Sequence, residues 1–401
     1  MRKAILGGII FFTMIVITAC SGKDVITQQV GLEQMELKKQ DIEVYIQQEV
    51  TSGLCEPESG VYLGAYVEKN INLDNNIKNF EQTIGHEQAF RVFQYSGLGS
   101  VGSSDILACI ANKQTPYIKV MMDENYDTSQ IYQMIGDIRS SYSSTIFIEL
   151  YPVTSKVNNP VEYKQHYEEA YKIIKKYIKN AVIVWSVDLE KSQESMSYYP
   201  GNHLVDWVGM NIYLPQYKGE KAYNPAIHQS IDFWYKNFQD KKPMLISSLA
   251  VSYFSRVDHT YAIEAAKNKL NLFYTDIVHA YPRIKGILYI DVDMKEVSKE
   301  GLEDYRISSH SQIMSHMKEI LADGIFLHEV KKSEGETQKE YLKYTVPAIT
   351  HSGKTYIPEE YTQNLFGGVK IKAVERIEDL SGNVYYSLNQ LIEHTPAYYT
   401  K

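Results

Sequence analysis

Over residues 57–327, short apolar runs alternate with longer segments in which apolar residues recur at helical spacing. Eight runs are interpreted as strands: residues 60–67, 90–97, 116–123, 145–152, 182–188, 206–215, 242–254 and 284–293. Strands that alternate with helices indicate a parallel sheet. Eight such units over about 270 residues fit the size of a (β/α)8 TIM barrel. A doubly wound open sheet is the alternative, although no G-x-G-x-x-G follows the first run to favour its dinucleotide-binding version.

The segments on either side of this region have other patterns. Residues 1–19 begin with the basic MRK and continue as an apolar run that is short for a membrane span and typical of a secretory signal. Residues 20–56 are polar, and we expect a spacer that is partly helical. Residues 328–341 are charged and are predicted to be a linker.

The C-terminal block, residues 342–401, contains two similar stretches. Residues 352–368 and 381–394 each show a Ser-Gly turn, a short strand and a helix with an apolar stripe. This pattern predicts a diverged internal repeat in a small α+β domain.

Composition narrows the classes of partner. The chain is 44% hydrophobic and 22% charged, which is typical of a globular protein, and its net charge of −8 argues against a nucleic-acid partner. The 33 tyrosines indicate either a Tyr-rich core or stacking against sugars.

Cys55 and Cys109 either form a disulfide or are two buried thiols. Neither has neighbours at metal-ligand spacing, so we expect no metal and no cofactor.

Two terminal segments resemble known modules. The residues ITAC at 17–20 resemble a bacterial lipoprotein signal, which implies that Cys20 becomes the lipidated first residue and tethers the protein outside the cytoplasmic membrane. The C-terminal block resembles the stalk domain related to the N-terminal domain of copper amine oxidases. That resemblance implies a cell-wall or protein-binding spacer without copper chemistry.

The central region resembles glycoside hydrolase family 26, the β-mannanase family. The stretches that carry the resemblance are GVYLGAYV (60–67), YYPGNHLVDWVGMNIY (198–213) and YPRIKGILYIDVD (281–293). The resemblance implies a (β/α)8 barrel over residues 57–327 that cleaves β-linked mannans and related β-glucans with retention of configuration. Retention needs two carboxyl groups about 5–5.5 Å apart, one to protonate the leaving oxygen and one to attack the anomeric carbon.

The resemblance places these two groups on strands four and seven. The acid/base position is Glu149, and the nucleophile position is Ser248. The family usually has a His before the acid/base and an Asn two residues after it, where this chain has Ile148 and Tyr151. A serine cannot supply the negative charge that stabilises an oxocarbenium-like transition state, so the predicted catalysis is degenerate.

Other residues near the predicted strand ends offer alternatives. Four aromatic residues are candidates for sugar contact: Trp185, Tyr213, Tyr151 and Tyr199. Asp291 is a weak candidate for a relocated nucleophile, and Asp188 and Asp293 are further candidates, although a loop cap or an ion pair explains each carboxylate equally well. An inverting mechanism would need a gap of roughly 6.5–9.5 Å to Glu149.

The sequence therefore predicts a lipid-anchored envelope protein whose barrel binds a polysaccharide or cell-wall glycan as a pseudoenzyme. The first alternative is an active β-glycan hydrolase that uses Glu149 and a relocated carboxylate. The second is an interaction or wall-anchoring scaffold that binds no sugar.

Overall fold

The computed structural model describes residues 39–122, 126–152, 159–333, 335–367, 369, 373–379 and 381–400. The predicted signal and Cys20 lie outside these residues. The chain divides into two compact units, one of residues 43–345 with 397–400 and one of residues 39–42 with 346–396. Among the described helices, none is long and apolar enough to cross a membrane.

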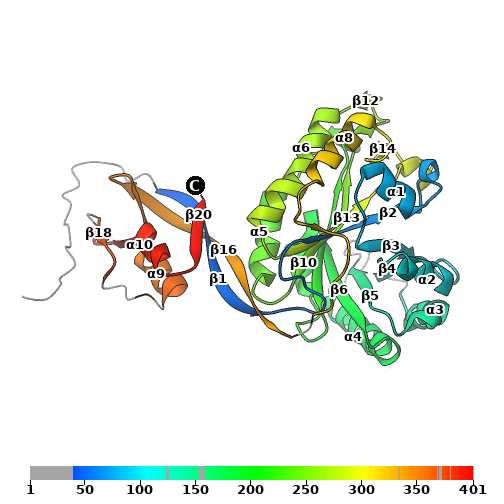
Figure 1. Ribbon diagram of the computed structural model, residues 1–401, viewed down its shortest axis with the longest axis horizontal. Helices are drawn as coiled ribbons and strands as arrows, with labels where there is room; N and C mark the ends of the chain where they lie inside the picture. Colours follow the sequence, from blue (N-terminus) through cyan, green and yellow to red (C-terminus); the bar gives the residue numbers. More distant parts are fainter. Residues whose placement is uncertain are drawn as a thin grey trace, which may run out of the picture. The chain divides into compact units, whose positions relative to one another are not determined.

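The larger unit is built on a closed barrel of eight parallel strands (Figure 1). The strands are β2 (Val61–Tyr66), β3 (Phe90–Tyr95), β4 (Thr115–Met122), β5 (Ile146–Pro152), β6 (Ala181–Asp188), β7 (Trp207–Leu214), β10 (Met244–Val251) and β13 (Ile284–Ile290). Each strand pairs with the next, and β13 pairs with β2 to close the barrel. The predicted (β/α)8 fold is confirmed.

Helices follow the strands and surround the barrel (Figure 1). They are α1 (Ile77–Ile84), α2 (Ser103–Ala111), α3 (Thr128–Asp137), α4 (Pro160–Tyr177), α5 (Ile227–Phe238), α6 (Ile263–Asn271), α7 (Val278–Ala280) and α8 (Ser311–Ile320). Asn76, Asp127 and Asn159 cap α1, α3 and α4, because their side chains accept hydrogen bonds from backbone N–H groups of the first turn. The apolar faces of these helices pack against the outer side of the strands, where most of the hydrophobic core lies.

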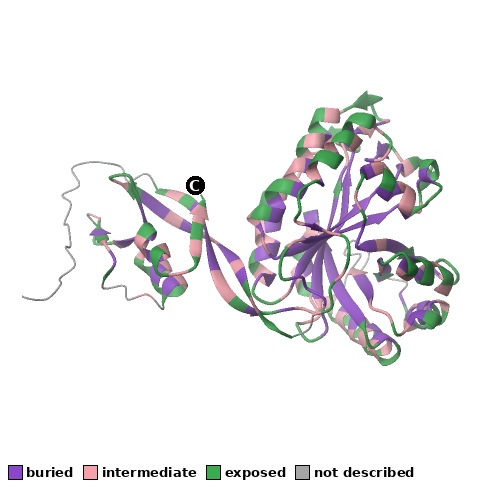
Figure 2. Cartoon of the chain, in the orientation of Figure 1, coloured by how far each residue is buried: buried purple, intermediate pink, exposed green. Residues whose placement is uncertain are grey.

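The inside of the barrel forms a second, smaller core. Figure 2 shows that the barrel strands are almost entirely buried. Large side chains fill the interior near the N-terminal ends of the strands, among them Tyr62, Phe90, Tyr117, Phe147 and Trp207. The indole Nε1 of Trp207 donates to the carbonyl of Leu54 at 2.7 Å. The barrel is therefore a packed core at this level, and function must lie near the opposite ends of the strands.

Several short strands complete the larger unit. The strand β8 (Tyr217–Lys218) pairs with β9 (Lys221–Ala222). The strand β11 (Phe254–Ser255) pairs with both β12 (Thr260–Tyr261) and β14 (Glu303–Asp304). The strand β15 (Phe326–Leu327) pairs with β2. The expected partly helical spacer is wrong for its described part, because β1 (Lys39–Thr51) is a strand that pairs antiparallel with β20 (Ala397–Thr400). The strand β16 (Thr337–His351) likewise begins within the predicted linker.

The smaller unit contains the predicted repeat. The strand β17 (Lys354–Pro358) leads directly into α9 (Glu359–Phe366), and β19 (Val384–Ser387) leads directly into α10 (Leu388–Glu393); β18 (Arg376–Glu378) pairs with β19. Ser352 and Gly353 connect β16 to β17 with φ of 50° and 76°, which is the two-residue turn that favours glycine. The strand–helix repeat predicted from the sequence is thus present.

The two cysteines lie in different cores. Cys55 packs inside the barrel with the interior side chains, and Cys109 lies on α2 between helix and strands. They form no disulfide with each other. Burial raises the pKa of the Cys109 thiol to about 12, so this cysteine is expected to be unreactive.

Candidate functional site

Polar side chains gather inside the barrel toward the C-terminal ends of five neighbouring strands. We call this group the Lys119–Glu149 network; its members are Lys119 on β4, Glu149 on β5, Ser186 on β6, Asn211 on β7, and Ser247 and Ser248 on β10. An irregularity in the pairing of β10 with β7 between Ile246 and Ser248 allows both serines to face this network. The network lies where barrel enzymes place their chemistry.

Glu149 is the centre of the network, and it has no exposed surface. Hydrogen-bond donors surround its carboxylate. Tyr117 Oη lies 2.8 Å and Lys119 Nζ 3.2 Å from Oε2. Ser186 Oγ donates to Oε1 through a short bond, and Asn211 Nδ2 and Ser247 Oγ each lie 3.4 Å from Oε1. Burial and the adjacent carboxylate raise the pKa of Tyr117 well above its ordinary value. Among these partners Lys119 is the one that brings a positive charge to the buried carboxyl group.

Lys119 contacts both residues that the sequence resemblance assigns to the catalytic pair, Glu149 and Ser248. Its ammonium forms the ion pair with Glu149 and also donates to the hydroxyl of Ser248, to Asn211 Oδ1 at 2.7 Å and to the carbonyl of Ser247 at 3.2 Å. Its side chain is 9% exposed. Where a retaining mechanism needs two carboxyl groups, this barrel therefore has one carboxylate, one serine and an ammonium that contacts both.

A glycine makes room for this packing. A Cβ atom at Gly209 on β7 would lie 2.8 Å from Ser247 Oγ and 3.0 Å from Ser186 Cβ. Those distances are shorter than van der Waals contact, so only glycine lets the two serines approach Glu149 from adjacent strands.

The carboxylates weighed as replacement nucleophiles have other partners. Asp291 follows β13 and accepts from Asn70 Nδ2 at 2.6 Å and from Ser308 Oγ at 2.6 Å. Burial raises the pKa of Asp291 to about 6. Asp293 pairs with Arg256 at 2.8 Å and with Arg306 at 3.2 Å. Both carboxylates hold loops together, and neither bonds to the Lys119–Glu149 network.

Asp188 is nearer to the network. The hydroxyl of Tyr151 donates to Asp188 through a short hydrogen bond, and the ring of Tyr151 lies 5.8 Å from Lys119 Nζ. Burial raises the pKa of the Asp188 carboxyl, while the Tyr151 hydroxyl and the Lys119 charge oppose that rise. Of the three aspartates, Asp188 alone connects through described contacts to Glu149.

The four aromatic candidates divide into two pairs. Tyr151 follows Glu149 on β5 by two residues, and Tyr213 near the end of β7 is 40% exposed. The prediction of sugar contact is wrong for Trp185, which has no exposed surface. Tyr199 is half-buried, and its ring packs 5.0 Å from that of Trp185 and 5.0 Å from that of Phe238 on α5, so its contact with sugar stays a prediction. Trp185 points out of the barrel, because alternate residues of a strand face opposite sides.

Sequence reasoning missed Lys119, Asn211 and Ser186. Each is a polar residue within an otherwise apolar strand, and that interruption is the signal that could have identified them. Within the described residues, no group of His, Cys, Asp and Glu could hold a metal ion.

Comparison with known proteins relates the barrel to enzymes that act on glycosidic bonds. The sequence profile of Glycosyl hydrolase family 26 matches residues 151–281. No curated protein sequence matches the chain.

Solved structures share the fold at low sequence identity. GH26C from Muricauda sp. MAR_2010_75 has a TM-score of 0.50 at 11% identity, covering 69% of this chain and 91% of that one. A GH2 β-galacturonidase from Eisenbergiella tayi has a TM-score of 0.50 at 11% identity, covering 70% and 55%. A modular endo-β-1,4-mannanase from Cellulomonas fimi has a TM-score of 0.49 at 12% identity, covering 71% and 81%. The chain thus has a glycoside hydrolase-like (β/α)8 barrel, and its residues 151–281 are similar to Glycosyl hydrolase family 26.

Proposed function

We propose that the barrel binds a polysaccharide at the C-terminal ends of its strands and no longer hydrolyses it. The observation that carries this proposal is the ion pair of Lys119 with Glu149 at 3.2 Å, beside a serine at the nucleophile position. A glycosyl transition state is positively charged and needs a carboxylate against its anomeric carbon. An ammonium in that place opposes the same charge, so the arrangement favours binding over catalysis.

Two tyrosines near the C-terminal ends of the strands support a sugar ligand. Tyr213 and Tyr151 flank the strand ends, and the ring of a tyrosine offers a flat apolar face for a sugar together with a polar tip. The relationship to family 26 supports a β-linked glycan such as mannan, with mixed-linkage glucan and xylan as the neighbouring classes to compare.

Replacing Tyr213 with alanine is expected to weaken glycan binding roughly tenfold, equivalent to about 1.4 kcal/mol, because an exposed ring that stacks on sugar is lost. Isothermal titration of the full chain with soluble mannan, mixed-linkage glucan and xylan oligosaccharides measures the change. Thermal unfolding should be unaffected, since Tyr213 is 40% exposed.

The matched control is Tyr132→Ala on α3, where the tyrosine is 50% exposed on an outer helix. It is expected to leave binding unchanged. Equal losses in the two variants would contradict a site at the strand ends. A wild-type chain that binds none of the glycans would instead favour the scaffold that binds no sugar.

A second candidate function is favoured by Asp188. This carboxyl connects to Glu149 through Tyr151 and Lys119, and burial raises its pKa. An active hydrolase would use Asp188 as the proton donor and Glu149 as the charged partner. That candidate requires turnover that disappears in both Glu149→Gln and Asp188→Asn.

We also propose that the chain is anchored outside the cytoplasmic membrane by lipid on Cys20. The apolar run that ends in ITAC supports this placement. The C-terminal unit would then act as a stalk-like spacer of the envelope. Neither proposal affects the chemistry of the barrel.

Changing Cys20 to serine is expected to abolish incorporation of labelled palmitate and to release the protein from the membrane fraction of a bacterial host, because the acylated thiol is missing. Labelling of the expressed full chain followed by fractionation measures both effects. Cys55→Ser and Cys109→Ser serve as controls. Labelling that persists in Cys20→Ser would overturn the anchor.

A further inference from the structure

The barrel is open to solvent one step beyond the Lys119–Glu149 network, toward the C-terminal ends of the strands. Gln94 on β3, Met121 on β4 and Tyr213 on β7 each lie two residues beyond a side chain that faces the interior, so they face it too. Gln94 is exposed, and Met121 and Tyr213 are 47% and 40% exposed. Glu149, by contrast, has no exposed surface. A ligand that enters from this end therefore meets the outer residues before it can reach the network.

Asp188 lies among these outer residues. It is the last residue of β6, two residues beyond Ser186, whose hydroxyl donates to Glu149 inside the barrel. Its Oδ1 accepts the short hydrogen bond from Tyr151. Burial raises the pKa of the Tyr151 hydroxyl, and the nearby Asp188 carboxylate and Tyr213 hydroxyl add to that rise. Asp188 and the two tyrosines are therefore neighbours at the strand ends.

One oxygen of Asp188 remains available to a ligand. The residue is half-buried, and among the described residues no group donates a hydrogen bond to its Oδ2. This oxygen is not one of the buried atoms that lack a partner in the described part of the chain, so it reaches solvent. A carboxylate oxygen accepts hydrogen bonds and donates none, so it suits a donor such as a sugar hydroxyl.

Lys119 has no proton to spare for an acidic ligand. An ammonium has three protons, and four acceptor atoms of the network already surround this one. The negative charge of Asp188 would also repel the carboxylate of an acidic sugar placed beside it. The strand ends therefore favour a neutral glycan.

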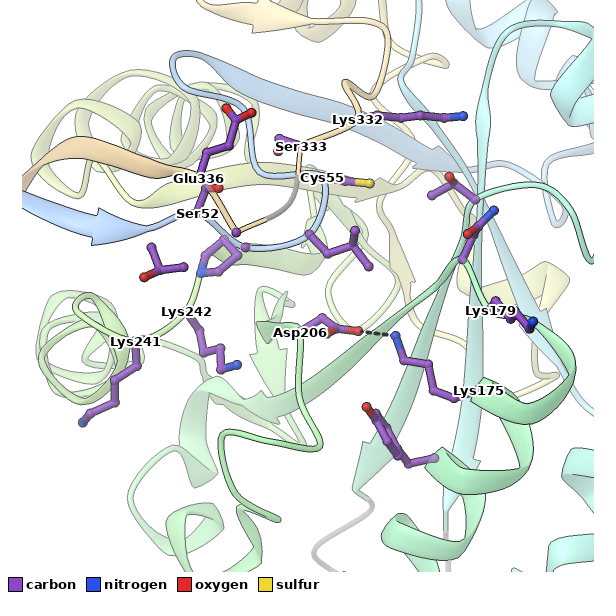
Figure 3. A pocket seen from close by; sticks show the side chains of 18 residues that line it. Ser52, Cys55, Lys175, Lys179, Asp206, Lys241, Lys242, Lys332, Ser333 and Glu336 are labelled. Carbon is purple, nitrogen blue, oxygen red and sulfur yellow. Dashed lines mark hydrogen bonds and ion pairs between the residues drawn. The ribbon is translucent and has the colours of Figure 1, made fainter.

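The carboxylate that precedes β7 differs from Asp188. Asp206 lies in a pocket among residues that precede the strands, and Figure 3 shows it facing Lys175. Its Oδ2 pairs with Lys175 at 3.1 Å and accepts from the backbone N–H of Ile183 at 2.8 Å. A lysine thus compensates the charge of Asp206, whereas no lysine or arginine of the described chain forms an ion pair with Asp188.

We propose that Asp188 determines which glycan binds at the strand ends. Its available oxygen accepts hydroxyl groups of a neutral sugar whose ring stacks on Tyr213, and its charge excludes glycans built of acidic sugars. This inference rests on the proposed glycan function. It assigns to Asp188 a role in recognition and not in proton transfer.

Isothermal titration of the full chain with mannan, mixed-linkage glucan and xylan oligosaccharides and with trigalacturonate tests the proposal. The wild-type chain is expected to bind a neutral oligosaccharide more tightly than trigalacturonate. Asp188→Asn should weaken the neutral binding roughly tenfold, because a neutral amide is a poorer acceptor than a carboxylate. The same variant should bind trigalacturonate more tightly, because the like charge is gone. A purely structural role would not change the two affinities in opposite directions.

The matched control is Glu194→Gln. This carboxylate also follows β6, is 67% exposed and pairs with Lys191 at 2.7 Å. It should change both affinities by less than about twofold, because water screens that pair. Circular dichroism confirms that each variant folds.

The outcomes separate this inference from the glycan function. Binding that weakens in Tyr213→Ala but not in Asp188→Asn would overturn the role of Asp188 alone, as would a wild-type preference for trigalacturonate. Hydrolysis of the oligosaccharides that is lost in Asp188→Asn would overturn it in favour of a catalytic role. A wild-type chain that binds none of the four probes would overturn the glycan function and this inference with it.

Discussion

The full chain is expected to release reducing ends from mannan, mixed-linkage glucan and xylan no faster than its Glu149→Gln variant. A retaining glycosidase needs a charged nucleophile opposite its acid, and Ser248 has no charge to offer. Loss of one member of a catalytic pair typically costs about four orders of magnitude or more in rate. Here the effect is compounded by Lys119, whose ammonium lies 3.2 Å from Glu149 and would repel the cationic transition state.

A reducing-sugar assay with a mannanase as positive control measures this result. Turnover that is lost in both Glu149→Gln and Asp188→Asn would contradict it and establish the hydrolase that uses Asp188. Ser248→Glu alone is expected to restore little, because the new carboxylate would lie against Lys119 and form an ion pair with it. The informative comparison is therefore Ser248→Glu with and without Lys119→Ala.

Replacing Lys119 with methionine is expected to lower the free energy of unfolding by about 3–5 kcal/mol. The change removes one partner of a buried ion pair and leaves the Glu149 carboxylate without a counter-charge in an interior where it has no exposed surface. Adding Glu149→Gln to Lys119→Met should recover much of the loss, because the neutral amide needs no cation. Urea unfolding of the two single variants and the double variant gives the coupling energy.

The control for this cycle is an ion pair of similar length on the surface. Lys172 and Glu168 on α4 are 2.6 Å apart, with side chains 67% and 45% exposed. Lys172→Met should change stability by less than about 1 kcal/mol, because water screens that pair. A Lys119→Met variant that is as stable as Lys172→Met would mean that Glu149 is not held by the buried lysine.

The local pattern of apolar and polar residues was sufficient to predict the strands and helices whose partners are near in sequence. The eight apolar runs predicted the eight barrel strands, and the two Ser-Gly turns predicted the strand–helix repeat of the smaller unit. The local pattern did not predict a strand whose pairing partner is distant in sequence. The sequence predicts a partly helical spacer at β1, but this segment is a strand that pairs with β20 near the other end of the chain. The polar composition of β1 gives no sign of that pairing.

The candidates for sugar contact illustrate a second limit of prediction from the sequence pattern, which concerns the direction in which a strand residue points. Strands of a parallel barrel are buried on both faces, so their sequences are nearly continuous apolar runs without a polar side. Alternation therefore does not reveal which residues face the interior. The place of Trp185 near a strand end predicts sugar contact, yet its side chain packs against Tyr199 and Phe238 outside the strands.

By itself, the sequence determined that this chain forms a (β/α)8 barrel and that serine stands where a nucleophilic carboxylate is expected. Only the tertiary structure decided which side chain lies between that serine and Glu149. Lys119, Glu149, Asn211 and Ser248 are far apart along the chain, and each lies within a mostly apolar strand. Closure of the barrel places their inward side chains at one level, and only there does the lysine become the counter-charge of the glutamate.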